Sequence, residues 1–265
     1  MSAFLLASGG EAPPKTVFTP LWEMIKDTSL AEKFGFNEVK DNMGQFWFEA
    51  VCFSFCAALF LIVISAIATR KYKQVPRGVQ NLLEWAVGLL RGLVRSFIGE
   101  GGDKYLPYLG TVFLFIFVMN VMGLIPAFRS PTMTLSTTAA LGVVTFVMVQ
   151  FYAVRDTGLL TYLKHFMGDI LWLAPLMIVV EIVGEFARPV SLSLRLFGNI
   201  FGEDMVIEKL LHMGQDFYLP LQIPMMAFAI FGSFLQAFIF TCLASLYIGQ
   251  KVTHEEGHGE ESHGH

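Results

Sequence analysis

Ionisable residues interrupt a long hydrophobic segment that runs from about residue 168 to residue 213. The interrupting residues are Glu181, Glu185, Arg188, Arg195, Glu203, Asp204 and Glu208. A charged side chain at mid-bilayer costs at least about 2.5 to 3.5 kcal/mol on insertion scales, so such residues normally face protein or water and have a function. The chemistry that this set indicates is the movement of ions across a membrane.

A structural salt bridge is the simpler interpretation for some of these charges. Glu185 and Arg188 are three residues apart, a spacing at which opposite charges meet on one helix. A structural pair therefore stays open for these two residues. Arg195 has no acidic residue three or four positions away on either side, so a salt bridge within its own helix explains Arg195 poorly.

The angular positions of these residues on a helix form two stripes. At about 100° per residue, small residues fall within about 80° on one side of Arg195. They are Gly184, Ala187, Ser191, Gly198 and Gly202. Asn199, Glu181, Glu185 and Glu203 fall within about 80° on the other side, and Asp204 is about 180° away. Arg195 therefore lies at the seam between a smooth stripe and a polar stripe.

The two stripes suit different tasks. Small residues let another helix approach the backbone closely, and Gly198 and Gly202 stand in GxxxG register. Static helix packing stays open as the simpler interpretation of this stripe. The carboxylates suit a water-lined path for ions, and an arginine between the stripes would stop ions from passing straight through. Pro189 is a position at which this helix can kink.

The elements that must position these residues are membrane spans. Hydrophobic residues make up 54% of the 265 residues and charged residues only 15%, too few polar side chains to cover a soluble globule. Four stretches carry no Asp, Glu, Lys or Arg: 50–69, 105–128, 132–154 and 217–250. About 20 apolar residues cross about 30 Å of hydrocarbon, so each stretch can span, and the last should be tilted.

We predict an all-α integral membrane protein with about five membrane-spanning helices and one amphipathic interfacial helix, the last two spans being long and tilted. The predicted spans are 46–69, 105–124, 134–154, 168–213 and 222–250, and the interfacial helix is 79–98. They form a membrane domain at 46–250. An N-terminal extracytoplasmic segment at 1–45 precedes it, and an acidic, His-rich cytoplasmic tail at 251–265 follows it.

Basic residues at the ends of the spans predict the orientation. Lys and Arg favour the cytoplasmic side, and the strongest run of them follows the first span, at Arg70, Lys71, Lys73 and Arg77. Arg155 and Lys164 follow the third span and agree with this assignment. We therefore expect a multi-pass protein of a bacterial plasma (inner) membrane, with the N-terminus outside and the C-terminus inside. The N-terminus shows no features of a signal or transit peptide.

Several function classes do not fit the sequence. The net charge of -4, with its acidic excess in the tails, argues against nucleic-acid binding. No Gly-rich phosphate loop is present, so the chain is not expected to bind nucleotide. Cys52, Cys56 and Cys242 lie in apolar stretches and are expected to act as small hydrophobes. We expect no catalytic site, no cofactor and no metal site, with metal capture by the His-rich tail left as a minor alternative.

Three separated motifs resemble landmarks of subunit a of F-type ATP synthases. The first is PVSLSLRLFGN at 189–199, and the others are FVMNVMGLIP at 117–126 and LQAFIF at 235–240. Their order and spacing also match, and the resemblance covers about residues 46–250. A chance match of all three is improbable.

The resemblance implies a stator ion-channel subunit that lies against a ring of subunit c, with subunit b of the peripheral stalk and membrane lipids as further partners. Arg195 matches the essential arginine of the family, which faces the carboxylates of the ring and separates two half-channels for protons or Na⁺. Polar positions of the family around that arginine and its access paths match Asn199, Gln236, Glu181 and Asn120. Asp204 stands where many members have Glu or His, whereas Ala229 stands where some have a titratable residue.

The resemblance, together with the expected orientation, assigns some site residues to contact with the c-ring and others to one of two ion paths. Gly184, Ser191, Gly198 and Gly202 are expected to contact the c-ring. Glu181 precedes Arg195 on the fourth span and belongs to the inner path, while Glu203 and Asp204 belong to the outer path. The family match favours Asp204 over Glu203 as the outer gate.

A secondary ion-coupled transporter remains the alternative function, although the sequence shows no internal repeat that would support it. An intramembrane enzyme would need a His pair or an Asp pair at membrane depth. His165 and His212 lie instead at predicted span ends.

Overall fold

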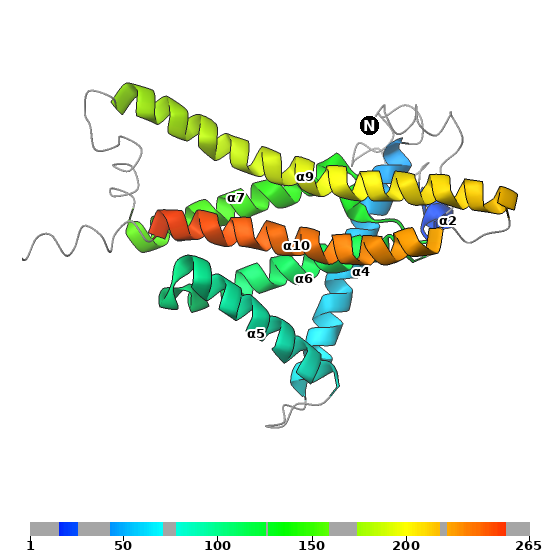
Figure 1. The fold of residues 1–265 in the computed structure, drawn as a ribbon, viewed down its shortest axis with the longest axis horizontal. Helices are drawn as coiled ribbons and strands as arrows, with labels where there is room; N and C mark the ends of the chain where they lie inside the picture. The colour runs from blue at the N-terminus through cyan, green and yellow to red at the C-terminus, as the bar shows by residue number, and fades with distance from the viewer. Residues whose placement is uncertain are drawn as a thin grey trace, which may run out of the picture. The chain divides into compact units, whose positions relative to one another are not determined.

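The computed structural model describes residues 16–25, 43–70, 78–125, 127–158, 174–217 and 222–252, and all regular elements in these residues are helices (Figure 1). The longer helices are α4 (Met43–Arg70), α5 (Val79–Ile98), α6 (Leu106–Met122), α7 (Leu135–Thr157), α9 (Ala174–Phe217) and α10 (Gln222–Val252). The shorter ones are α2 (Thr19–Ile25) and the 3-10 helices η1 (Glu100–Lys104) and η2 (Pro131–Met133). The predicted all-α class is confirmed.

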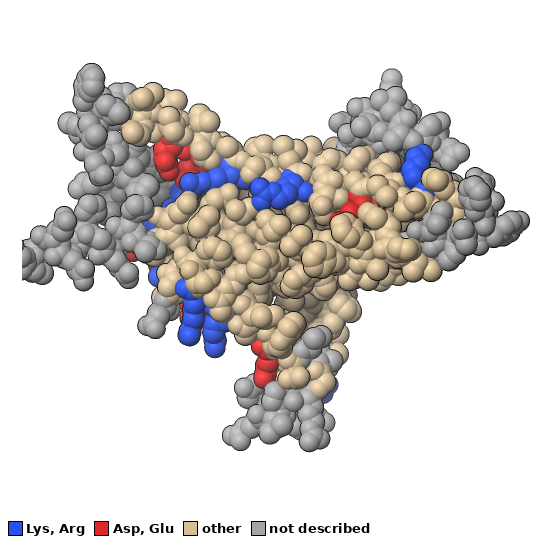
Figure 2. Space-filling view, in the orientation of Figure 1, with Lys and Arg blue, Asp and Glu red and all other residues tan. Residues whose placement is uncertain are grey.

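Apolar helices long enough to cross a bilayer are present among the described residues. They cover Gly44–Ala68, Leu135–Thr157 and Ile223–Val252, and α6 is apolar but shorter, at 17 residues. Many of their large apolar side chains are exposed, and charged groups are sparse on the described surface in view (Figure 2). Such a surface needs hydrocarbon or a partner to cover it. The chain is a multi-pass helical membrane protein.

The last two helices are the longest, as predicted. α9 has 44 residues and α10 has 31. At about 1.5 Å per residue, α9 is about 66 Å long, roughly twice the thickness of the hydrocarbon core, so it must tilt strongly or project beyond it. Pro189 stands inside α9, and the helix continues on both sides of it. Residues 168–173 of the predicted fourth span lie outside the described residues, as do 253–265 of the predicted tail and most of 1–45.

The predicted interfacial helix coincides with α5. Trp85, Val87 and Leu89 are exposed on it, as are Arg91 and Arg95. A helix that exposes both apolar and charged side chains suits the boundary between lipid and water. Beyond its end, the Arg95 guanidinium bonds the carboxylate of Asp103 at 2.6 Å and holds the pKa of that carboxyl below its usual range.

The chain forms two compact units that alternate along the sequence. The first unit is Met1–Ile67, Leu114–Thr138 and Leu194–Ala237, and the second is Ala68–Phe113, Ala139–Ser193 and Phe238–His265. Helices α4, α6, α7, α9 and α10 each contribute one segment to each unit. Of the predicted site residues, Glu181, Gly184 and Ser191 lie in the second unit and the others lie in the first.

The core of the first unit is built around Phe53 of α4, which is completely buried. Its ring lies 4.8 Å from that of Phe18 and 5.5 Å from that of Phe128. The turn after α6 is tight, because a Cβ at Gly123 would lie 2.7 Å from the Cβ of Ser130. This turn brings the segment that follows α6 back against α4.

Close approaches at glycines connect helices in the second unit. A Cβ at Gly142 of α7 would lie 2.8 Å from the carbonyl oxygen of Pro189 in α9. A Cβ at Gly249 of α10 would lie 2.7 Å from the carbonyl oxygen of Phe97 in α5. Any larger residue at these two positions would push the helices apart.

Candidate ion-translocation site

Arg195 lies on α9 in the first unit, and its side chain is exposed. Leu196, Ile200 and Glu203 are buried on this part of the helix, at the spacing of a single helix face. Arg195 is off that face and makes no hydrogen bond or ion pair with any described residue. The guanidinium is therefore available to a group outside the described chain.

The predicted small residues are also open on the helix surface. In the first unit, Gly198 and Gly202 are exposed, and no heavy atom lies within 4 Å of a Cβ built at either position. In the second unit, Ser191 is exposed and a Cβ at Gly184 would meet nothing within 4 Å. These residues thus do not mediate packing among the described helices, which was the simpler interpretation of the stripe.

Asn199 and Glu203 meet on the polar side of α9, as their spacing predicts. Asn199 Nδ2 donates to Glu203 Oε1 at 2.9 Å. Glu203 is only 8% exposed, and no described Lys or Arg lies within ion-pairing distance of it. Its carboxylate is therefore held by an amide rather than by a cation.

The charge of Asp204 interacts with the charges of the neighbouring Glu203 and of Glu208, both on α9. The same charge interacts with Arg129, which follows α6, and Arg129 also interacts with Glu208 of α9. That Asp204 points away from the stripe and toward other helices of the same chain stays a prediction.

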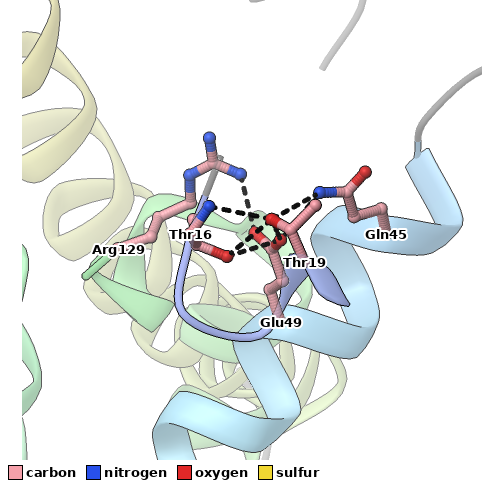
Figure 3. A network of polar contacts seen from close by, with 5 residues as sticks. All are labelled: Thr16, Thr19, Gln45, Glu49 and Arg129. Atoms are coloured by element: carbon pink, nitrogen blue, oxygen red, sulfur yellow. Dashed lines mark hydrogen bonds and ion pairs between the residues drawn. The ribbon is translucent and has the colours of Figure 1, made fainter. Parts of the chain in front are cut away.

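A buried ion pair anchors the same Arg129. Arg129 donates to Glu49 Oε2 at 3.0 Å, and Glu49 is completely buried (Figure 3). The other carboxylate oxygen accepts hydrogen bonds from Thr16 at 2.7 Å, from Gln45 at 2.8 Å and from Thr19 at 3.2 Å. These contacts join α2, α4 and the segment after α6, all in the first unit.

Asn120 and Gln236 are buried in the first unit, at 3% and 6% exposure. Asn120 Oδ1 accepts a hydrogen bond from Thr132 at 2.7 Å, and the Thr132 hydroxyl lies 2.6 Å from that of Ser130. Nδ2 of Asn120 is buried and has no partner among the described residues. A free buried donor beside two hydroxyls is a suitable place for a water molecule.

Glu181 lies in the second unit and is partly exposed, whereas the neighbouring Glu185 is fully engaged. Glu185 Oε1 lies 3.0 Å from Arg188 and 2.7 Å from Lys251, and Oε2 accepts a hydrogen bond from Gln150. Lys251 also donates to Gln150 at 2.7 Å. The structural pair left open for Glu185 and Arg188 is therefore present, and it extends to α7 and α10.

Sequence reasoning missed Glu49, Arg129, Gln150 and Lys251. Glu49, Arg129 and Lys251 each stand at the edge of a charge-free stretch, which was the available signal. Residues at span ends usually meet water, so their burial could not be read from position alone. Among the described residues, no group of three or more His, Cys, Asp or Glu could hold a metal ion.

Known proteins resemble this chain over most of its length. The family model described as ATP synthase A chain matches residues 51–249. ATP synthase subunit a of Geobacter sulfurreducens is 41% identical over 215 residues, which cover 81% of this chain and 89% of that protein. ATP synthase subunit a of Trichlorobacter lovleyi is 42% identical over 214 residues (81% and 88%), and ATP synthase subunit a 2 of Syntrophotalea carbinolica is 40% identical over 226 residues (85% and 93%). The match to the family model and the extent of these identities show that the chain belongs to the ATP synthase A chain family.

Proposed function

We propose that this chain is the stator ion channel of a rotary ATP synthase and passes protons or Na⁺ to and from a rotating ring of subunit c. The observation that carries the proposal is that Arg195 is an exposed cation on α9 and has no partner among the described residues. An unpaired charge at membrane depth costs at least about 2.5 to 3.5 kcal/mol. A carboxylate on another subunit would remove that cost.

The surface around Arg195 suits a moving partner. Gly198 and Gly202 leave the backbone open next to the arginine, so a helix of the ring could approach closely and slide past. Gly184 and Ser191 would extend this contact along α9. Large side chains here would interlock with the ring and impede its rotation.

The polar groups are proposed to form two half-channels. Glu203 and Asp204, which are assigned to the outer path, lie in the first unit together with Asn120, Asn199 and Gln236. Glu181 lies in the second unit and is assigned to the inner path. Arg195 would separate the paths, so that an ion must travel on the ring to pass from one to the other.

The proposed orientation places the N-terminus outside and the C-terminus in the cytoplasm, with the chain in the inner membrane of a bacterium. It is supported by Arg70 at the end of α4, Arg155 near the end of α7 and Lys251 near the end of α10. Subunit b of the peripheral stalk would hold the chain against the ring. Nucleotide chemistry would belong to other subunits.

Arg195→Ala tests the proposal. In vesicles that contain the complete synthase, this change should abolish ATP synthesis driven by an ion gradient while the complex still assembles. Moving one charge through 100 mV is worth about 2.3 kcal/mol, and a leak between the half-channels would dissipate that energy. Coupled synthesis near the wild-type rate would refute the proposed function.

A further inference from the structure

The carboxylate of Glu203 lies against a glycine of the next helix. In the first unit, the segments of α9 and α10 run alongside each other in opposite directions (Figure 1). A Cβ built at Gly232 of α10 would overlap with Oε1 of Glu203 and would lie 3.1 Å from its Cδ and 3.4 Å from Oε2. The carboxylate therefore occupies the space that a side chain at position 232 would fill.

Gly232 belongs to the buried face of α10. Ala229 is 1% exposed and Gln236 is 6% exposed, and both are three or four positions from Gly232, on the same helix face. Because the helices are antiparallel, one turn back along α9 from Glu203 reaches Asn199, and one turn forward along α10 from Gly232 reaches Gln236. The two amides thus lie at about the same depth, between Glu203 and the level of Arg195.

Helix stability does not explain a glycine at this position. Glycine inside a helix is about 1 kcal/mol less favourable than alanine, and Gly232 lies well within α10. The carboxylate of Glu203, and not the backbone of a neighbouring helix, fills the space that a side chain at Gly232 would occupy. The contact with Glu203 is therefore the feature that the missing side chain permits.

We propose that Gly232 is a positioning residue of the outer path, which lets the carboxylate of Glu203 sit between α9 and α10 within hydrogen-bonding distance of Asn199. Glu203 is two helical turns, about 12 Å, from Arg195, and Asn199 lies halfway. Polar groups thus follow one another along α9, from the carboxylate of Glu203 through the amide of Asn199 toward Arg195. This inference rests on the proposed function, in which ions reach the ring through groups of the first unit.

The structure predicts which atoms move when Gly232 is replaced. An alanine methyl group would displace the end of the flexible Glu203 side chain by on the order of 1 Å, because overlapping atoms must separate to ordinary contact distance. The helix backbones need not shift. Gly232→Ala should therefore leave assembly of the synthase intact and disturb only the position of the carboxylate.

The test is a double-mutant cycle in vesicles that contain the complete synthase. Gly232→Ala should lower gradient-driven ATP synthesis by up to about 10-fold, within the roughly 10²-fold that a misplacement of about 1 Å can cost. In a Glu203→Gln background, Gly232→Ala should cause no further loss. Combining Gly232→Ala with Glu203→Asp, which shortens the acid by one methylene, should restore part of the rate. Gly110→Ala is the matched control, since a Cβ there meets only Leu90 at an ordinary 3.8 Å.

Three results would overturn the inference: wild-type synthesis in Gly232→Ala, an equal loss from Gly232→Ala with and without Glu203→Gln, or no effect of Glu203→Gln itself. None of these would by itself reject the stator function, which Arg195→Ala tests separately. Synthesis near the wild-type rate in Arg195→Ala would reject both.

Discussion

The ammonium group of Lys251 on α10 lies 2.7 Å from Oε1 of Glu185 on α9, and the two side chains are only 8% and 5% exposed. Gln150 of α7 bridges them, because it accepts from Lys251 and donates to Glu185. Arg188 bonds the same carboxylate at 3.0 Å and lies over the ring of Tyr247. Three helices of the second unit are thus tied together at one point.

Lys251→Met should weaken this cluster substantially. Removing one partner of a buried ion pair costs about 3 to 5 kcal/mol, because the other charge stays buried and less well compensated. Arg188 and Gln150 still bond Glu185, so we expect the lower end of that range. The measurement is the thermal unfolding midpoint of the purified complex in detergent. Lys209→Met serves as the control, since Lys209 is exposed on α9.

The cluster also separates the roles of two neighbouring acids. The carboxylate of Glu185 bonds two cations and an amide, so its charge stabilises the structure, whereas Glu181 is partly exposed. Glu185→Gln should therefore lower stability more than activity per assembled complex. If Glu185→Gln instead slowed ion transport in fully assembled complexes, Glu185 would be part of the inner path.

Glu49→Gln should destabilise the first unit in a similar way. The substitution leaves Arg129 buried opposite a neutral amide, and Glu49 is more deeply buried than Glu185, at 0% against 5% side-chain exposure. We expect a loss of about 3 to 5 kcal/mol, seen as less assembled subunit in the membrane. Activity per assembled complex should change little. Full assembly of Glu49→Gln with lost ion transport would place Glu49 in the outer path instead.

The sequence was most informative where residues of one helix share a face. The predicted helix at 79–98 coincides with α5, and the predicted proximity of Asn199 and Glu203 is confirmed. Both follow from a period of about 3.6 residues. The exposure of Gly198 and Gly202 agrees with their place on the stripe as well.

Contacts between distant parts of the chain could not be predicted in this way. The ion pair of Glu49 with Arg129 and that of Glu185 with Lys251 each join different helices or segments. Their formation depends on which helices are neighbours and at what depth, and periodicity contains no information on either. The contact between the Glu203 carboxylate and Gly232 also depends on which helices are neighbours, so periodicity could not predict it.

Gly202→Leu tests whether a moving partner passes along α9. The position is exposed and open in the structure, so a leucine there fits the chain itself and should not prevent assembly. It would project into the surface proposed to face the ring. ATP synthesis and ATP-driven rotation should both be blocked in assembled complexes. Normal rotation and coupling would show that this surface faces lipid.

Asp204→Asn and Glu203→Gln together locate the outer gate. Asp204 follows Glu203 and so lies about 100° further around α9, where its charge interacts with that of Arg129. Glu203 instead contacts Gly232 of α10 and accepts a hydrogen bond from Asn199. If ions enter on the side of α9 that bears Asp204, they meet Asp204 first and Glu203 later. Neutralising the gate should slow ion uptake without uncoupling, because Arg195 would still separate the two proposed paths.

We therefore expect both changes to lower gradient-driven synthesis, Asp204→Asn by more than Glu203→Gln, with the passive ion leak unchanged in each. Reconstituted vesicles allow synthesis and leak to be measured on the same preparation. Both substitutions keep size and polarity, so a difference between them reports the lost charge. A larger defect in Glu203→Gln would place the outer opening on the polar stripe, between α9 and α10, because ions arriving there would reach Glu203 without passing Asp204.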